Sequence, residues 1–346
     1  MAPYFFIISL VMFSIYFEKI TLNRKAFWIP FFLLSVFAGI RNRSVGTDTG
    51  AYVALFEINL DPKYYDFNSN VEIGYQFFEY ILLNLTHNYY WLFLLTAFFI
   101  VYSFLLIIKK YSINYFLSVF VYITLGVYTF FFNGLRQGIA IAICFLALPY
   151  VINKNFLKYL FFVFFASFFH ISAWVMLPFY FLVHANFKLQ YKVLISFLFS
   201  LFVSGFLISY LAQDNIRYEA YAEVSDSAGG YATLLFYLFF AIVIYFLGRR
   251  ERLVNNEYKV FEQIYLCGLF FVIPITFLGT SASGPQRVLN YFIPMLVFLI
   301  PFIVSKLKYN FVKFIFYFCL VIFFYVTTMR FSNLTPYLIN PVFEIF

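Results

Sequence analysis

The sequence predicts an all-α, polytopic integral membrane protein with about twelve membrane-spanning helices (roughly 10–13), arranged as a single membrane domain over residues 1–346. Apolar residues make up 64% of the chain and charged residues only 11%, with a mean hydropathy of +0.88. A water-soluble protein of this size could not bury so much apolar surface. The apolar residues also form long runs, and a helix satisfies its own backbone hydrogen bonds inside lipid.

Apolar runs define the predicted spans, although several are shorter than the about 20 residues that usually cross a bilayer. The run 156–184 is either two short spans that meet near His170 or one long tilted span, and its length, Pro178 and the polar break from His170 to Ser172 favour two. The predicted spans are residues 2–17, 26–40, 89–108, 115–132, 134–152, 156–170, 171–184, 193–211, 231–247, 261–279, 287–304 and 311–328.

Two longer segments separate the spans and are predicted as outer loops, at about residues 41–88 and 212–230. The first of them contains an amphipathic helix over residues 71–85. Its polar residues Glu72, Gln76 and Glu79 share one helical face, and the opposite face is apolar, with Ile73, Phe77, Tyr80, Ile81 and Leu85. Such a helix is expected at a membrane interface or as a re-entrant segment, and not as a span.

Lysine and arginine residues indicate the orientation of the spans. Most of the 23 lie on one side, which the positive-inside rule assigns to the cytoplasm, so both chain ends are expected outside. The outer side holds mainly arginine, with Arg41, Arg43, Lys63, Arg136, Arg217, Arg287 and Arg330. An arginine fork binds phosphate or carboxylate at two points. The outer arginines are therefore functional candidates, with pairing to outer acidic residues as the alternative.

The segment from Phe131 to Gly138 places an arginine, the amide of Gln137 and two glycines between two apolar runs. Asn133 is predicted to cap the helix that follows, so that Arg136 lies in its first turn, where the helix dipole disfavours a cation by up to ~1 kcal/mol. No acidic residue is close to Arg136 in the sequence. We therefore expect a phosphate to bind here. The alternative is that Arg136 reaches lipid headgroups.

The segment from Arg41 to Tyr52 combines two arginines with glycines and hydroxyl groups. Arg41, Arg43, Thr47 and nearby backbone N–H groups are predicted to surround an anion. Asp48 is a candidate general base, or a partner that orients one of the arginines. The alternative is that Thr47 and Asp48 cap the following helix.

Two further polar segments contain candidate residues. The segment from Phe168 to Trp174 contains His170, and the segment from Gly284 to Phe292 contains Arg287 and Tyr291. His170 is a candidate general base or a stabiliser of a leaving phosphate, with a satisfied histidine at a helix end as the alternative. Arg287 begins a predicted span on the outer side. The predicted topology places the candidate residues of all four segments on one leaflet, which indicates a single outer site.

Other chemistries lack their motifs in this sequence. There is no nucleotide-binding P-loop, no nucleophile elbow, no Asp-x-Asp sequence and no cysteine–histidine metal set, and no basic soluble module suits nucleic acid. We therefore expect no metal and no cofactor. A membrane enzyme of this kind takes an activated substrate from the membrane. A lipid-linked diphosphate fits, because arginines stabilise the departing diphosphate while a carboxylate or imidazole deprotonates the acceptor.

The order of these segments resembles that of the EpsG-type branch of bacterial polysaccharide polymerases, which includes Wzy-like O-antigen polymerases. The resemblance covers about residues 36–304. It is carried by Arg41 with Val45-Gly46-Thr47-Asp48-Thr49 and Tyr52, Glu72-Ile73-Gly74-Tyr75, Asn133-Gly134-Leu135-Arg136-Gln137, Phe169-His170-Ile171-Ser172-Ala173 and Arg287-Val288-Leu289-Asn290-Tyr291-Phe292.

The resemblance implies a polymerase in the bacterial inner membrane, with an active site facing the periplasm or cell exterior. Such an enzyme moves a growing glycan from undecaprenyl diphosphate to a lipid-linked repeat unit. A fold like that of GT-C membrane glycosyltransferases is expected, with membrane lipids around it and a chain-length regulator as the usual partner.

On this hypothesis the donor or acceptor diphosphates bind Arg41, Arg43, Arg136 and Arg287. Asp48 or His170 is the base, Glu72 is the third choice, and Thr47, Asn133, Gln137 and Tyr291 support the site. Two alternatives stay open. One is a membrane glycosyl- or acyltransferase that adds a single group to a surface glycan. The other is a transporter or flippase for polysaccharide precursors.

Overall fold

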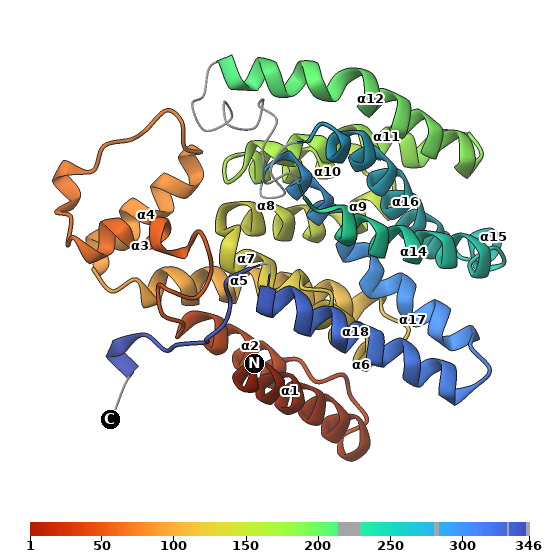
Figure 1. The fold of residues 1–346 in the computed structure, drawn as a ribbon, viewed down its shortest axis with the longest axis horizontal. Helices are drawn as coiled ribbons and strands as arrows, with labels where there is room; N and C mark the ends of the chain where they lie inside the picture. Colours follow the sequence, from red (N-terminus) through yellow and green to blue (C-terminus); the bar gives the residue numbers. More distant parts are fainter. Residues whose placement is uncertain (214–228, 280–283, 331, 344–346) are drawn as a thin grey trace. The chain divides into compact units, whose positions relative to one another are not determined.

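The computed structural model describes residues 1–213, 229–279, 284–330 and 332–343 (Figure 1). These residues form α-helices and short 3-10 helices and no named β-strand. The second predicted outer loop, about residues 212–230, lies almost wholly outside the described residues.

Eight described helical segments are long and apolar enough to cross a membrane. They are α1 (Ala2–Thr21), α5 (Tyr90–Tyr111), α6 with α7 (Tyr115–Thr124 and Val127–Asn133), α8 with α9 (Leu135–Leu146 and Leu148–Ile152), α12 (Leu189–Gln213), α16 (Asn256–Phe277), the segment Pro285–Lys306 and α18 (Asn310–Arg330). The segment Pro285–Lys306 consists of η3 (Pro285–Tyr291), η4 (Ile293–Met295) and α17 (Leu296–Lys306).

Four shorter apolar helices complete the set: α2 (Trp28–Gly39), α10 (Phe156–Ser167), η2 with α11 (Ile171–Val175 and Met176–His184) and α14 (Tyr231–Leu247). Each predicted span coincides with one of these long or short helices. The structure therefore confirms a helical membrane protein, while the total of about twelve spans stays a prediction.

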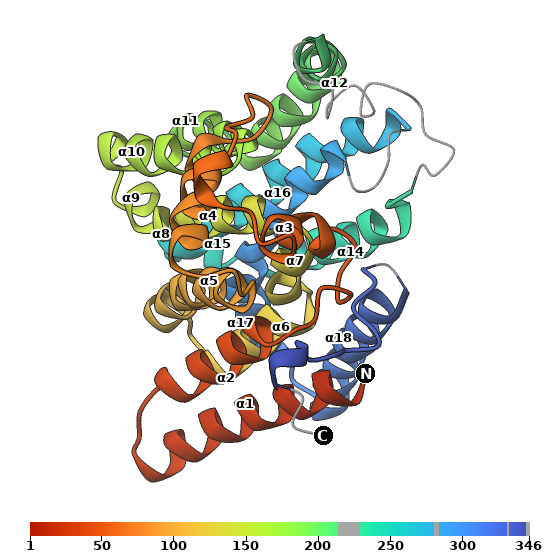
Figure 2. The same cartoon turned by 90° about the vertical axis from the view of Figure 1, so that its left-hand side faces the viewer.

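The chain forms two compact units, and the first comprises Met1–Leu146, Phe164–Ile171 and Leu307–Phe346. In this unit α2 packs against α1 and α5, and α5 packs against α8. Figures 1 and 2 both show α1 beside α2. The C-terminal residues return to the loop that follows α2, where Arg41 and Ile339 form an isolated antiparallel bridge. This unit also contains α3 (Thr49–Glu57), η1 (Pro62–Tyr64), α4 (Ile73–Leu85) and η5 (Pro341–Phe343).

The second unit comprises Ala147–Val163 and Ser172–Lys306 and is organised around α16. The helices α9, α11, α12, α14 and α17, together with the short α15 (Glu251–Val254), all pack against α16. Gly268 lies in the middle of α16, where a Cβ atom would approach the Phe292 ring to 2.0 Å. The lack of a side chain at this position lets the buried Phe292 pack directly on the helix backbone.

The amphipathic helix expected over residues 71–85 is present as α4, and its polar face is the buried one. Gln76 and Glu79 are buried, whereas Phe77 is 57% exposed and Leu85 76% exposed. The helix therefore turns Gln76 and Glu79 toward its own unit, together with Leu82 and Leu83, and its predicted apolar face outward. An outward apolar face suits a membrane interface, which stays the predicted location of α4.

We expect Gly268→Ala to lower the stability of the second unit, because the new methyl group overlaps the Phe292 ring and overpacking costs about 1–3 kcal/mol. Thermal unfolding of the detergent-solubilised protein measures the change. Gly205→Ala in α12 is the matched control, because a Cβ atom there meets nothing within 4 Å. The control should leave stability unchanged or raise it by up to about 1 kcal/mol. Equal unfolding midpoints for the two variants would contradict the packing argument.

Candidate functional site at a helix break

The centre of the site is a break between two helices at Gly134. The helix α7 ends at Asn133 and α8 begins at Leu135, with the first intrahelical bond running from Gly138 N–H to the Gly134 carbonyl at 2.6 Å. The prediction that Asn133 caps the second helix is therefore wrong. Its carboxamide makes contacts between distant segments: Oδ1 accepts a hydrogen bond from Thr47 N–H at 2.7 Å, and Nδ2 donates to the Ser332 carbonyl at 2.9 Å.

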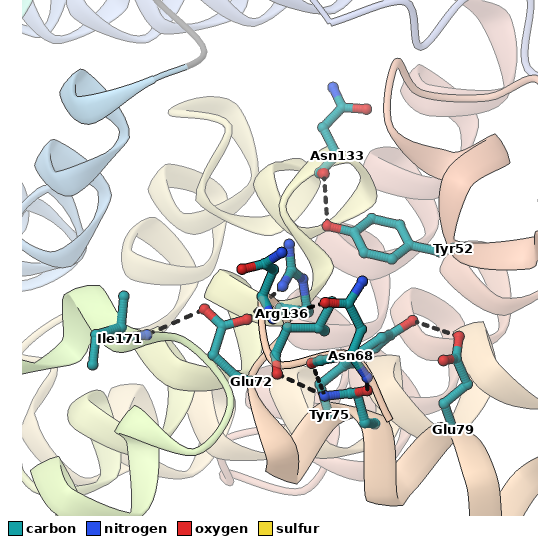
Figure 3. A network of polar contacts seen from close by, with 11 residues as sticks. Tyr52, Asn68, Glu72, Tyr75, Glu79, Asn133, Arg136 and Ile171 are labelled. Atoms are coloured by element: carbon teal, nitrogen blue, oxygen red, sulfur yellow. Dashed lines mark hydrogen bonds and ion pairs between the residues drawn. The ribbon is translucent and has the colours of Figure 1, made fainter. Parts of the chain in front are cut away.

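Arg136 lies in the first turn of α8 and forms an ion pair with Glu72 (Figure 3). Glu72 is the residue immediately before α4, so its acid comes from a segment 64 residues earlier in the chain. The two side chains are 19% and 13% exposed. The acidic partner that the sequence near Arg136 lacks is thus supplied by tertiary structure. Removing one member of this partly buried pair leaves the other charge uncompensated, at a cost of up to about 3–5 kcal/mol.

Glu72 also reaches the segment that contains His170. Its second carboxylate oxygen accepts a hydrogen bond from the Ile171 N–H at 3.3 Å, and Gly74 N–H donates to the Phe168 carbonyl at 2.8 Å. A Cβ atom on Gly74 would come within 2.7 Å of that carbonyl, which explains the glycine. His170 itself is half-buried after the end of α10. Three of the four polar segments found in the sequence therefore meet in the first unit, and Glu72 joins two of them directly.

The remaining polar residues of α4 hold the chain that leads into Glu72. The Gln76 amide accepts from Asn68 N–H at 2.7 Å and donates to the carbonyls of Asn68 and Val71 at 2.9 and 2.6 Å. The sequence places Gln76 on the polar face of this helix and indicates no role for it. Its three bonds fold residues 68–71 back onto α4 and so fix the position of Glu72 just before the helix.

Glu79 makes the second set of contacts on this face. It accepts hydrogen bonds from the hydroxyls of Tyr65 at 2.8 Å and Tyr75 at 3.3 Å. Burial raises the pKa of Glu79 above its usual value, and the two hydroxyl donors counteract that rise. The centroid of the Tyr75 ring lies 5.9 Å from the Arg136 guanidinium carbon. Tyr75 therefore interacts with Glu79 through its hydroxyl and with Arg136 through its ring.

The loop of residues 41–48 packs beside the helix break. Gly46 N–H donates to the Asn333 carbonyl at 2.8 Å, and Thr49 Oγ1 lies 3.2 Å from the Phe132 carbonyl. Asp48 occupies the N-cap position of α3, but its side chain makes no capping hydrogen bond. It instead accepts from the Thr47 hydroxyl at 3.1 Å. The capping alternative is therefore wrong for the Asp48 side chain.

The two arginines of this loop have opposite surroundings. Arg41 is fully buried, with its guanidinium carbon 3.7 Å from the Phe93 ring centroid and 4.5 Å from that of Phe132. Its Nη1 donates to the Ala38 carbonyl at 2.6 Å, and within the described residues its Nε and Nη2 have no hydrogen-bond partner. Burial lowers the pKa of Arg41 to about 10. Arg43 is exposed and forms an ion pair with Glu57.

Arg287 and Tyr291 belong to the second unit, where both lie in η3. The Arg287 carbonyl accepts a hydrogen bond from Asn290 Nδ2 at 3.0 Å, and the Tyr291 hydroxyl lies 3.0 Å from Ser172 Oγ. Gln137 is buried in α8 beside Arg136. The structure thus gathers Arg136, Glu72, Asn133, Thr47 and the loop with Asp48 in one unit, and Arg287 and Tyr291 are described in the other.

We predict that Gly46→Ala disrupts the loop. Gly46 has a φ of +110°, and an added Cβ atom would lie 2.5 Å from both Asn133 Oδ1 and Thr49 Oγ1. Gly50→Ala is the matched control, since a Cβ atom there meets nothing within 4 Å. Limited proteolysis of the solubilised variants should show faster cleavage between residues 41 and 50 only for Gly46→Ala. The same cleavage rate in both variants would contradict the proposed packing.

Comparison with known proteins agrees with the resemblance noted in the sequence. No curated protein and no solved structure matches the chain. The family model described as the EpsG family matches residues 24–339, which is nearly the whole chain and includes every candidate residue above. The chain therefore belongs to the EpsG family of Wzy-like polysaccharide polymerases.

Proposed function

We propose that this protein is a surface-polysaccharide or O-antigen polymerase, which transfers a growing glycan from undecaprenyl diphosphate to a lipid-linked repeat unit. Membership of the EpsG family supports a membrane polysaccharide polymerase in general. The single observation that carries the specific proposal is the Glu72–Arg136 ion pair at the helix break. It presents a guanidinium in the first turn of a helix, where an anionic group is favoured.

Arg136 is proposed to hold the diphosphate that leaves the donor. A diphosphate competes with the Glu72 carboxylate for the same guanidinium and offers it a bidentate partner. Glu72 then loses the cation that stabilises its negative charge and becomes a better proton acceptor. The structure places Glu72 against Arg136, so we propose Glu72 as the first candidate for the base, ahead of Asp48 and His170.

The proposed reaction uses these two groups in one displacement. An acceptor hydroxyl oxygen forms a bond to the anomeric carbon of the donor glycan, and the bond from that carbon to the diphosphate oxygen breaks. The diphosphate leaves with the bonding electron pair, and Arg136 stabilises its charge. The hydroxyl proton passes to the Glu72 carboxylate.

The other arginines receive different proposed roles. Arg43 is exposed on the loop and is proposed to bind the second diphosphate, with Arg287 as a further candidate in the second unit. Arg41 is buried between two phenylalanine rings, so we propose that it supports the loop and does not touch a substrate. We further propose an outer-leaflet site in the plasma membrane, a GT-C-like architecture and a chain-length regulator as partner.

The test of the reaction uses purified protein in lipid with a lipid-linked repeat unit and neither metal nor nucleotide. A polymerase converts this substrate into a ladder of products that differ by one repeat unit. A single mass increment would instead indicate decoration of the glycan, and movement of the lipid across the bilayer without a new glycosidic bond would indicate transport.

We predict that Arg136→Lys lowers turnover in this assay by about tenfold or more, because lysine keeps the charge but loses the planar fork. The lysine still forms an ion pair with Glu72, so the unfolding midpoint should change little. Arg250→Lys in the second unit is the control, since Arg250 is exposed and lies outside the site. Wild-type product ladders from Arg136→Lys would overturn bidentate diphosphate binding by this residue.

A further inference from the structure

The segment Ser332–Phe343 follows α18 and ends in η5, and we name it the C-terminal strap. It pairs with the chain that follows α2: Asn42 N–H donates to the Leu338 carbonyl at 2.9 Å, and Asn340 N–H donates to the Ile40 carbonyl at 2.7 Å. No motif in the sequence indicates a role for this segment. Its hydrogen bonds to Asn42 and Phe37 join residues about 300 positions apart in the chain.

Aromatic side chains anchor the strap on the helices of the first unit. The Tyr337 ring stacks on Phe37 with centroids 4.3 Å apart and an interplanar angle of 10°, and its hydroxyl donates to the Phe37 carbonyl. The Tyr4 hydroxyl donates to the Leu334 carbonyl at 2.8 Å, and Leu334 is buried. The strap is therefore packed at both its beginning and its middle.

The strap accepts hydrogen bonds from two backbone N–H groups of the loop of residues 42–48. Its internal bonds are short-range, from Val45 N–H to the Asn42 carbonyl and from Ser44 N–H to the Asn42 side chain. The N–H groups of Asn42 and Gly46 are satisfied by carbonyls of the strap. Without the strap these groups lose their partners, and a short loop with few internal bonds does not keep one conformation.

Asn133 joins the strap and the loop to the helix break. Its Nδ2 donates to the strap at Ser332, and its Oδ1 accepts from the loop at Thr47. Asn133 is three residues before Arg136. One carboxamide therefore connects the loop of Arg43 and Asp48, the strap and the helix turn that carries Arg136.

We propose that the C-terminal strap is a positioning element of the site. It holds the loop with Arg43 and Asp48 in a fixed position relative to the helix break between Asn133 and Arg136. Turnover therefore depends on a segment that touches no substrate. The catalytic part of this inference rests on the function proposed above, whereas its structural part does not.

The test compares a chain truncated after residue 331 with full-length Asn133→Asp, in which the carboxylate keeps the acceptor for Thr47 N–H and loses the donor to Ser332. Hydrogen–deuterium exchange of the lipid-embedded protein is measured together with turnover. We expect exchange of residues 42–49 to accelerate about tenfold or more in both variants, with α1 and α5 unchanged, and turnover to fall about tenfold. Asn310→Asp is the matched control, because Asn310 is exposed in the same unit.

Wild-type exchange of residues 42–49 in Asn133→Asp would overturn the positioning role. Faster exchange throughout the first unit in that variant would also overturn it, because the strap would then be a general stability element. If the truncated chain fails to fold, Asn133→Asp alone decides. If wild-type protein makes no product ladder, the proposed polymerase reaction fails, while the exchange measurement still tests the strap.

Discussion

The structure of the site depends on one interaction, the ion pair between Glu72 and Arg136. A guanidinium in the first turn of an apolar helix is costly on two counts, because it is poorly solvated and because the helix dipole opposes it. Glu72 offsets both costs, and so the start of α4 must lie against the start of α8. Gln76 and Glu79 hold the preceding residues onto α4. The Ile171 N–H donates a hydrogen bond to the second oxygen of the Glu72 carboxylate.

This constraint explains why the polar face of α4 is buried and its apolar face is exposed. Its polar face is needed inside to carry Glu72, Gln76 and Glu79, and its apolar face is left outside. Asn133 connects the rest of the site. Its side chain does not cap α8 and instead bonds the loop at Thr47 and the C-terminal strap at Ser332. In the proposed function, the diphosphate of an anionic lipid replaces Glu72 as the partner of Arg136.

The sequence predicted the helices well because apolar runs and a polar stripe of helical spacing are local signals. It also found Arg136, Glu72 and the loop of Asp48 as candidates. It could not pair Glu72 with Arg136, since the two lie 64 residues apart and each is an ordinary residue of its type. Asn133 was misread because asparagine suits both a helix cap and a tertiary bridge. The role of the strap could not be predicted from the sequence, because the strap accepts hydrogen bonds mainly through its backbone carbonyls, which every residue has.

A cryo-electron microscopy structure of the protein in lipid nanodiscs with undecaprenyl diphosphate tests the proposed role of the ion pair. We expect the diphosphate to lie against the Arg136 guanidinium and Glu72 to be displaced from it, with the Asn133 contacts to the loop and strap retained. A diphosphate bound elsewhere, with the Glu72–Arg136 pair intact, would show that Arg136 does not bind it.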